Sequence, residues 1–181
     1  MRAARAVVML LVPILLSACN NASEPMSQRR MLPAALELAR VSGGQRVTGS
    51  ATVILPDHGN ALEHYSVSAI RHADGSVTGE FEEYSEQDGG QRIHASIVCF
   101  NVIGNSARLA ARIDQTNVPF GPVGSYVVWS VVDNGEGARS LPDQTTDIFF
   151  GGTAAQADFQ CATGFNLGPY FSSIRGNLQV Q

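Results

Sequence analysis

The stretch from Tyr65 to Glu82, YSVSAIRHADGSVTGEFE, decides the fold of this 181-residue chain. On both sides of Asp74-Gly75, apolar or small residues alternate with polar ones; the first set is Tyr65, Val67, Ala69, Val77, Gly79 and Phe81. A period of two is typical of a half-buried β-strand, and Asp-Gly is a strong hairpin signal. The stretch therefore predicts two antiparallel strands joined by a tight turn.

The same alternation recurs along the chain and predicts eight or nine short strands. They lie within 47–55, 65–69, 77–82, 93–99, 109–113, 126–132, 147–150, 157–162 and 174–180. Of these, 126–132 is almost wholly apolar and is expected to be buried on both faces. We predict an all-β fold, a small antiparallel β-barrel, with a two-sheet sandwich as the alternative. The barrel is favoured because Gly49, Gly79 and Gly176 fall inside strands, where glycine often marks the tight bends of a closed sheet.

The N-terminus has the layout of a bacterial export signal. Arg2 and Arg5 precede an apolar run of about 11 residues, which is shorter than a membrane span and contains Pro13. The run ends in Leu-Ser-Ala-Cys, with the cysteine at position 19, and this resembles the lipobox of bacterial lipoproteins. The resemblance implies removal of residues 1–18 and acylation of Cys19. A soluble secreted form is the alternative, although Leu16 fits its cleavage site poorly.

The following residues extend the same interpretation. Asn20, rather than aspartate, follows the cysteine, and by resemblance to lipoproteins this favours the outer membrane. Residues 19–44 are expected to form a lipid-anchored tether with a short helix at 32–41, and residues 45–181 to form the β-barrel domain. Which face of the outer membrane carries the domain is left open.

Three cysteines are an odd number for an exported protein, but lipidation of Cys19 leaves Cys99 and Cys161. Two cysteines outside the cytoplasm can oxidise to a disulfide; two buried free thiols are the alternative. Alternation places Cys99 on the same face as Ile93 and Ile97, so we expect its sulfur to point into the core. Cys161 is expected on a short strand, pairing with Cys99 and closing a loop of roughly 60 residues.

Three segments resemble an uncharacterised family of small exported bacterial proteins. They are RHADGSVTGEFE from Arg71, CFNVIGNSARLAARI from Cys99 and VDNGEGARSLPDQ from Val132. The resemblance covers residues 45–180 and implies one compact β domain, often with a second cysteine near the C-terminus. It implies no particular activity.

An acidic segment follows the apolar strand 126–132. Asp133, Asn134, Glu136 and Asp143 offer the oxygen ligands that calcium prefers, with glycines that permit a tight loop. The spacing matches no EF-hand, and Asn-Gly and Asp are also ordinary turn residues. We favour the turn interpretation over a calcium site.

Other candidate sites are weaker still. The histidines, at 58, 64, 72 and 94, are not spaced to converge on zinc. Glu80 and Glu82 share a face, as in acid–base carboxylate pairs, but a solvated acidic edge is favoured. No catalytic residue, cofactor or metal is therefore assigned. The net charge of −4, with no clustered basic residues, makes nucleic acid an improbable partner.

A proline-stiffened loop, 118–124, holds Phe120 close in sequence to Tyr126 and Trp129. It is predicted to be a lid or a docking tip, or else a plug that folds back into the core. The leading functional hypothesis is a non-catalytic outer-membrane lipoprotein that binds a small apolar ligand or an envelope partner. An enzyme, a hydrolase or isomerase using the barrel lumen, and a structural envelope protein are the alternatives. Converging polar groups inside the barrel would favour the enzyme.

Overall fold

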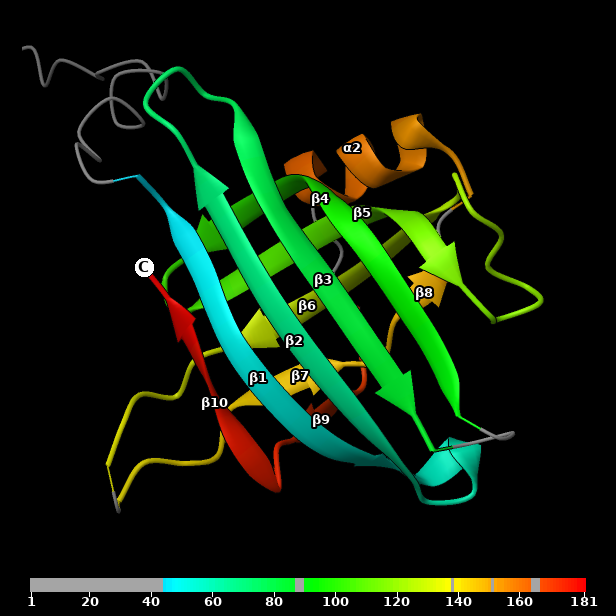
Figure 1. Ribbon diagram of the computed structural model, residues 1–181. Helices are drawn as coiled ribbons and strands as arrows, with labels where there is room; N and C mark the ends of the chain where they lie inside the picture. The colour runs from blue at the N-terminus through cyan, green and yellow to red at the C-terminus, as the bar shows by residue number, and fades with distance from the viewer. Residues whose placement is uncertain (1–43, 87–89, 138, 151, 164–166) are drawn as a thin grey trace, which may run out of the picture.

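The computed structural model describes residues 44–86, 90–137, 139–150, 152–163 and 167–181 (Figure 1). The predicted signal peptide, Cys19, the tether and the predicted helix at 32–41 lie outside the described residues. Most of the described chain is strand, which confirms the all-β prediction.

Ten strands, one 3-10 helix and one α-helix follow each other in the described chain. They are β1 (Arg46–Leu55), η1 (Pro56–His58), β2 (Ala61–Arg71), β3 (Val77–Ser85), β4 (Gln91–Ile103), β5 (Ser106–Thr116), β6 (Tyr126–Val132), β7 (Gln144–Thr146), β8 (Phe149–Phe150), α2 (Ala154–Thr163), β9 (Tyr170–Ser172) and β10 (Arg175–Val180). Strands β7 and β9 are not among those expected from the sequence, because three-residue strands show no period.

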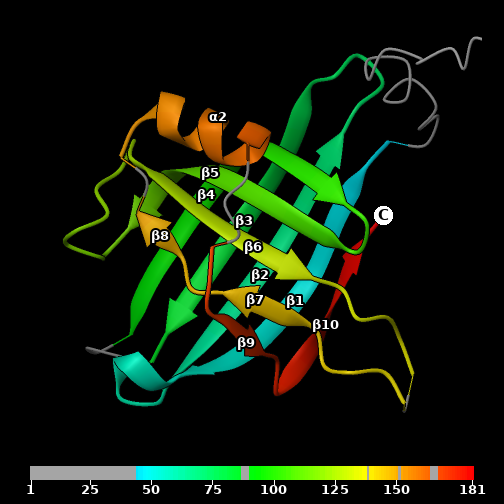
Figure 2. The ribbon, with the colours of Figure 1, turned by 180° about the vertical axis from the view of Figure 1, so that it is seen from behind.

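All the strands belong to one antiparallel sheet, in the order β10-β1-β2-β3-β4-β5-β6-β7-β9, with β8 paired to β6. The two ends of this order, β9 and β10, are separated in the chain by residues 173 and 174 alone. The sheet must therefore curl until its ends approach each other, and it forms a half-barrel (Figures 1 and 2). The barrel prediction is confirmed, and the two-sheet sandwich is wrong.

The hairpin that opened the sequence analysis is present as β2 and β3. The His72 amide donates to the Ser76 carbonyl oxygen at 2.8 Å across the turn, and Gly75 has a φ of 86°. Gly79 pairs with Ala69 and has a φ of 148°; a Cβ there would lie 1.9 Å from the Ser68 carbonyl oxygen. Close approach of β2 and β3 is thus the physical reason for a glycine inside this strand.

The interior of the half-barrel is filled by the inward side chains of the strands. Phe81 and Trp129 lie at its centre, with ring centroids 4.0 Å apart. The largest fully buried apolar side chains are Trp129, Phe81, Phe100, Leu55, Leu109, Ile113 and Leu178. The described side chains therefore fill the middle of the barrel.

Residues 157–162 form part of helix α2, not the strand expected from their alternation. Thr153 and Gln156 form a capping box: the Thr153 amide donates to Gln156 Oε1 at 3.0 Å, and the Gln156 amide donates to Thr153 Oγ1 at 3.3 Å. The helix buries Ala157, Gln160 and Cys161, which are spaced i, i+3, i+4. Among the described residues, no helix is long and apolar enough to cross a membrane.

Helix α2 lies on the outer face of the sheet and is joined to it by the Cys99–Cys161 disulfide, whose Cα atoms are 6.2 Å apart. The expectation that Cys99 points into the core is wrong. The pairing of β4 with β5 shifts register between Ile97 and Cys99, which is a β-bulge. The extra residue reverses the alternation, so Phe100 points inward and Cys99 faces the helix. The helix also covers Val128, which explains why β6 is buried on both faces.

Candidate functional site

A pocket of about 340 Å³ opens at the end of the half-barrel where η1 lies. Six separate parts of the chain converge there: η1, β2, β3, the start of β4, the loop 117–125 and the segment that carries β8. Its described lining residues are His58, Glu63, Glu83, Gln91, Val118, Phe120, Asp147, Ile148 and Phe150. Polar groups gather on one side of this pocket and apolar side chains on the other.

Two glutamates project from the strands into the pocket. Glu63 is 2% exposed, and Glu83 is 9% exposed. Strand alternation places them there: Glu63 is in phase with Tyr65 on β2, and Glu83 is in phase with Phe81 on β3. Because β2 pairs with β3, with Tyr65 opposite Glu83 and Glu63 opposite Ser85, the two carboxyl groups lie close to each other.

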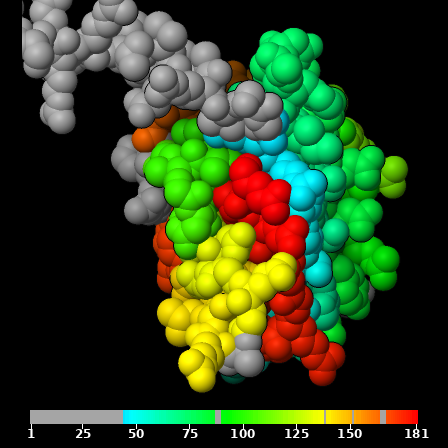
Figure 3. All heavy atoms as spheres, turned by 90° about the vertical axis from the view of Figure 1, so that its left-hand side faces the viewer, coloured from blue at the N-terminus to red at the C-terminus, as the bar shows by residue number. Residues whose placement is uncertain are grey.

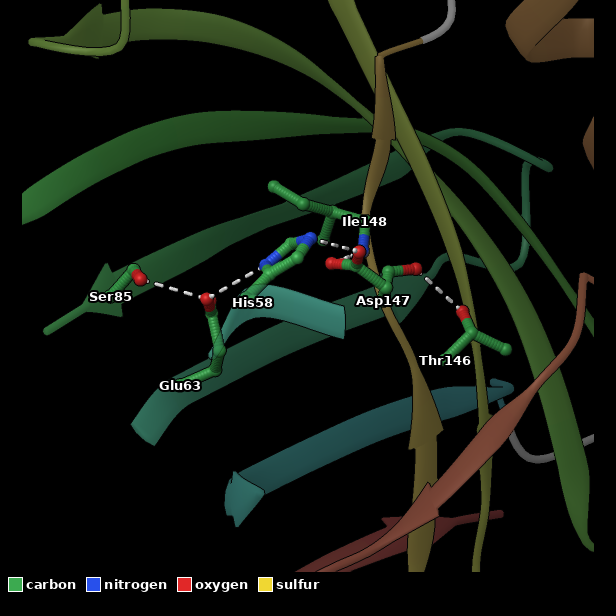
Figure 4. Close-up of polar contacts among 6 residues, drawn as sticks. All are labelled: His58, Glu63, Ser85, Thr146, Asp147 and Ile148. Atoms are coloured by element: carbon green, nitrogen blue, oxygen red, sulfur yellow. Dashed lines mark hydrogen bonds and ion pairs between the residues drawn. The ribbon is translucent and has the colours of Figure 1, made fainter. Parts of the chain in front are cut away.

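His58 connects this buried pair to a third carboxyl group, that of Asp147. Figure 4 shows its ring between the two, with Nδ1 3.6 Å from Glu63 Oε1 and Nε2 3.5 Å from Asp147 Oδ2. Ser85 Oγ donates to Glu63 Oε1 at 2.7 Å, and the Ile148 amide donates to Asp147 Oδ1 at 2.7 Å. The arrangement is a continuous polar chain from the half-exposed His58 to the buried glutamates.

Burial controls the protonation of this cluster. Desolvation, followed by the hydrogen bond and charge of Glu63 and the charge of Asp147, raises the pKa of Glu83 to about 10. Desolvation also raises the pKa of Asp147, although the charge of His58 acts in the opposite direction. Burial raises the pKa of Tyr65 as well, and the charges of Glu83, Glu63 and Asp147 add to this effect. Glu83 therefore carries a proton at neutral pH and can donate it to Glu63.

Two buried oxygens in this region, one of them on the pocket-lining Glu63, have no hydrogen-bond partner among the described residues. They are Glu63 Oε2 and the hydroxyl oxygen of Tyr65. Such orphaned atoms at a cavity are a mark of a site built for a ligand.

The apolar wall of the pocket comes from Val118, Phe120, Ile148 and Phe150. Phe120 is 61% exposed and meets the edge of Phe150, with ring centroids 4.9 Å apart. The loop 118–124 thus borders a pocket, as a lid would, and Phe120 does not plug the core. The three aromatics named from the sequence do not act together, because Trp129 lies in the core and Tyr126 packs on the side of α2.

A second, larger concave region of about 720 Å³ lies across strands β1 to β5. Its outward side chains form a row in which the Tyr84 ring stacks on His64 and lies under the Arg92 guanidinium, which is 4.8 Å from the ring centroid. Glu80 and Glu82 are exposed on this face, as expected, but β3 pairs with both β2 and β4. The interpretation of the glutamates as an acidic sheet edge is therefore wrong.

The acidic segment 133–143 lies on another side of the molecule, against β10 (Figure 3). Asp143 Oδ2 accepts from the Leu178 amide at 2.7 Å, and Asp133 Oδ2 accepts from the Val180 amide at 3.0 Å. The second oxygens of the two carboxylates accept from the amides of Asn134 and Gly135. We call this arrangement the seam: Asp133 and Asp143 with the β10 backbone.

The seam explains the residues for which calcium was considered. The bond from the Gly135 amide to Asp133 Oδ1, at 2.7 Å, is the turn contact that the sequence favoured. Glu136 accepts from the side chains of Asn177 and Gln179, and Asn134 Nδ2 donates to the Pro142 carbonyl oxygen. Among the described residues, no group of three or more His, Cys, Asp or Glu side chains is arranged to hold a metal ion.

Comparisons with protein-family models, curated proteins and solved structures find no match to this chain. Function must therefore be inferred from the sites themselves.

Of the residues that form the pocket's polar side, none was selected from the sequence. The signal was nevertheless present for two of them, since Glu63 and Glu83 stand at apolar positions of alternating strands. An acidic residue on the inward face of a strand indicates either a buried pair or a site. For His58, which lies outside the predicted strands, and for Asp147, at the very start of the predicted strand 147–150, the sequence carries no such signal.

Proposed function

We propose that this domain is a non-catalytic binding module of a bacterial lipoprotein, and that it takes a small molecule into the pocket beside η1. The observation that carries the proposal is the meeting of buried Glu63 and Glu83 beneath an apolar wall. Small-molecule sites combine a concave, largely apolar surface with a few convergent polar groups, and about 300–1,000 Å³ is their usual size. A ligand with both a polar head and a compact apolar body suits this pocket better than a wholly apolar one.

The membrane part of the proposal rests on the lipobox ending at Cys19 and on Asn20, which favour an outer-membrane lipoprotein. Strand β1 runs from the end of the half-barrel where the described chain begins to the end where η1 lies (Figure 1). A tether joined at residue 44 thus enters at the opposite end from the pocket. This geometry suits a domain that presents its binding site away from its anchor.

A second candidate, acid–base catalysis, is favoured by one specific observation. The buried Glu83 has a pKa raised to about 10, chiefly by desolvation, and His58 links the neighbouring Glu63 to Asp147 near the surface. Paired carboxyl groups with separated proton affinities are a common device for general acid and base roles. We rank this candidate second because the hydroxyl group of Ser85, which lies beside Glu63, already donates a hydrogen bond to that carboxylate.

A partner-docking role has the weaker support of Phe120 and Val123, each 61% exposed in the loop 118–124. If the pocket binds a small molecule, the exposure of these residues is explained instead by their position at the pocket entrance. Substituting Phe120 therefore bears on both alternatives.

The test is a screen of small molecules against the oxidised mature protein by methyl NMR. We expect the compounds that bind to shift the methyl signals of Val118 and Ile148, which line the pocket, and to leave Val98, on the outer face, unchanged. Compounds that shift only signals distant from the pocket, or the absence of any binder, would overturn the proposal. Chemical conversion of a bound compound that Glu63→Gln abolishes would replace binding with catalysis.

A further inference from the structure

We propose that the ligand of this pocket carries a nitrogen cation with N–H donors, an ammonium or amidinium group. The cation binds between Glu63 and Glu83, where Glu63 Oε2 is buried without a hydrogen-bond partner among the described residues. The inference rests on the proposed function of the same pocket and adds the chemical class of its ligand.

The acidic residues that line the pocket favour a positively charged ligand. Its described lining residues include three acidic side chains, Glu63, Glu83 and Asp147, and His58 as the basic one. An anionic head group would be repelled by the acids, and among the described lining residues there is no arginine to pair with it. A cation is attracted, and the low dielectric of a buried site strengthens that attraction.

The unpartnered buried oxygens indicate that the cation carries N–H hydrogen-bond donors. Glu63 and Tyr65 are 2% and 4% exposed, and Glu63 Oε2 and the Tyr65 hydroxyl bond to no described residue. A buried acceptor without a donor is costly, and a charged N–H donor gives one of the strongest hydrogen bonds that a carboxylate accepts. A quaternary cation without N–H groups would leave these oxygens unpaired.

The shape of the site favours an organic cation over a metal ion. A metal needs several ligand atoms that converge at about 2.0–2.6 Å from one point, and no such group exists among the described residues. An ammonium or amidinium group spreads its donors over several ångströms and can reach both glutamates. Phe120 and Phe150 then provide the wall for its apolar body.

Binding should release a proton. The charged and titratable groups around Glu83 are Glu63 and Tyr65 from β2 and Asp147 from the segment between β7 and β8; His58 contacts Glu63 and Asp147, and the charge of Asp57 acts on Asp147. When the cation enters, it takes the place of the Glu83 proton, which leaves to solvent, so the charge within the glutamate pair and its ligand is conserved. Affinity should therefore rise with pH, by up to tenfold per unit for one proton released.

The experiment is isothermal titration calorimetry of the oxidised mature protein with three matched probes. They are benzylamine, neutral benzyl alcohol and anionic benzoate, each titrated between pH 6 and 8 in buffers of different ionisation enthalpy to count protons. The variants are Glu63→Gln, Glu83→Gln and Glu82→Gln. Glu82 is the matched control, because it neighbours Glu83 on β3 but is exposed on the outer face.

We expect benzylamine to bind at least tenfold tighter than either other probe. About one proton should be released in the parent and in Glu82→Gln, and none in Glu83→Gln, whose amide has no proton to lose. Glu63→Gln should weaken benzylamine at least tenfold and change benzyl alcohol little.

Equal or tighter binding of benzyl alcohol or benzoate would overturn this inference and leave the proposed binding function standing. Binding of Ca²⁺ or Zn²⁺ alone that excludes benzylamine and depends on Glu63 would overturn it in favour of a metal. Failure of all three probes would also overturn it, and the methyl NMR screen then decides separately whether the pocket binds anything.

Discussion

Among the described residues, buried and half-buried carboxyl groups gather at the seam and in the pocket, and their surroundings differ. At the seam, both oxygens of Asp133 and of Asp143 accept hydrogen bonds from backbone amides. In the pocket, Glu63 and Glu83 face each other, and burial raises the pKa of Glu83 to about 10. The difference lies in the number of donors available to each group.

The comparison distinguishes acidic residues that stabilise the fold from acidic residues whose burial reduces its stability. At the seam the carboxylates replace the sheet hydrogen bonds that would otherwise be missing where β10 meets the acidic segment, so they stabilise the barrel closure. In the pocket the acids gain few partners and lose their hydration, so they reduce stability. Groups that a fold keeps at such a cost are frequent at functional sites.

The largest expected effect is at the seam. Asp143→Ala removes the acceptor of the Leu178 and Asn134 amides, and each buried unpaired donor costs about 1–3 kcal/mol. We expect the free energy of unfolding to fall by about 3 kcal/mol and the melting temperature by about 10 °C, measured by circular dichroism. Asp158→Ala, at an exposed position on α2, is the control. A melting temperature as little changed as in that control would remove the structural role of the seam.

The next effect concerns Glu83 and depends on pH. A carboxyl group whose pKa is raised in the folded state, here from 4.5 to about 10, binds more protons folded than unfolded across that interval. Stability must therefore fall as pH rises, by at most about 1.4 kcal/mol per unit. Glu83→Gln keeps a neutral side chain at all pH values, so we expect it to be more stable than the parent by about 2 kcal/mol at pH 8.

Urea unfolding at pH 6, 7 and 8 measures this effect, with Glu82→Gln as the control that should follow the parent. If Glu83→Gln loses stability with pH as steeply as the parent does, Glu83 is not the protonated group. In that case the conclusion that Glu83 reduces stability, unlike the seam carboxylates, would be wrong.

A milder substitution, Asp133→Asn, tests how much one acceptor oxygen contributes at the seam. Asp133→Asn retains one oxygen acceptor and loses the other, so one of the amides of Gly135 and Val180 loses its partner. Because a single hydrogen bond is removed near the surface, we expect a loss of about 1 kcal/mol in urea unfolding. A loss as large as that of Asp143→Ala would mean that charge, and not the count of acceptors, maintains the seam.

The smallest effect on stability is expected at the entrance of the pocket. Phe120→Ala removes a ring that is 61% exposed, so thermal unfolding should change by no more than about 0.5 kcal/mol. The same variant should weaken compounds that shift Val118 and Ile148, because it removes part of the apolar wall. Strong destabilisation would instead make Phe120 a core residue, as a plug would be.

Some of this architecture was predictable from the sequence. The β2–β3 hairpin, the alternating strands and the pairing of Cys99 with Cys161 all followed from local patterns and from cysteine arithmetic. The helix α2 was missed although Thr153 and Gln156 carry a capping-box signal, because the alternation of residues 157–162 resembles a strand. The inward position of Cys99 was wrong because a bulge, which has no clear sequence mark, reverses the alternation after Ile97.

By itself, the sequence determined which residues face inward along the regular parts of the strands, because a period of two is a local property of the chain; the bulge in β4 is the exception. It therefore contained the burial of Glu63 and Glu83, although not their meeting. Only the tertiary structure decided that β9 and β10 close the half-barrel, that Asp133 and Asp143 complete the β10 hydrogen bonds, and that His58 and Asp147 join the two glutamates. Those contacts link residues dozens of positions apart, so they depend on the curl of the whole sheet and leave no pattern in any short stretch of the chain.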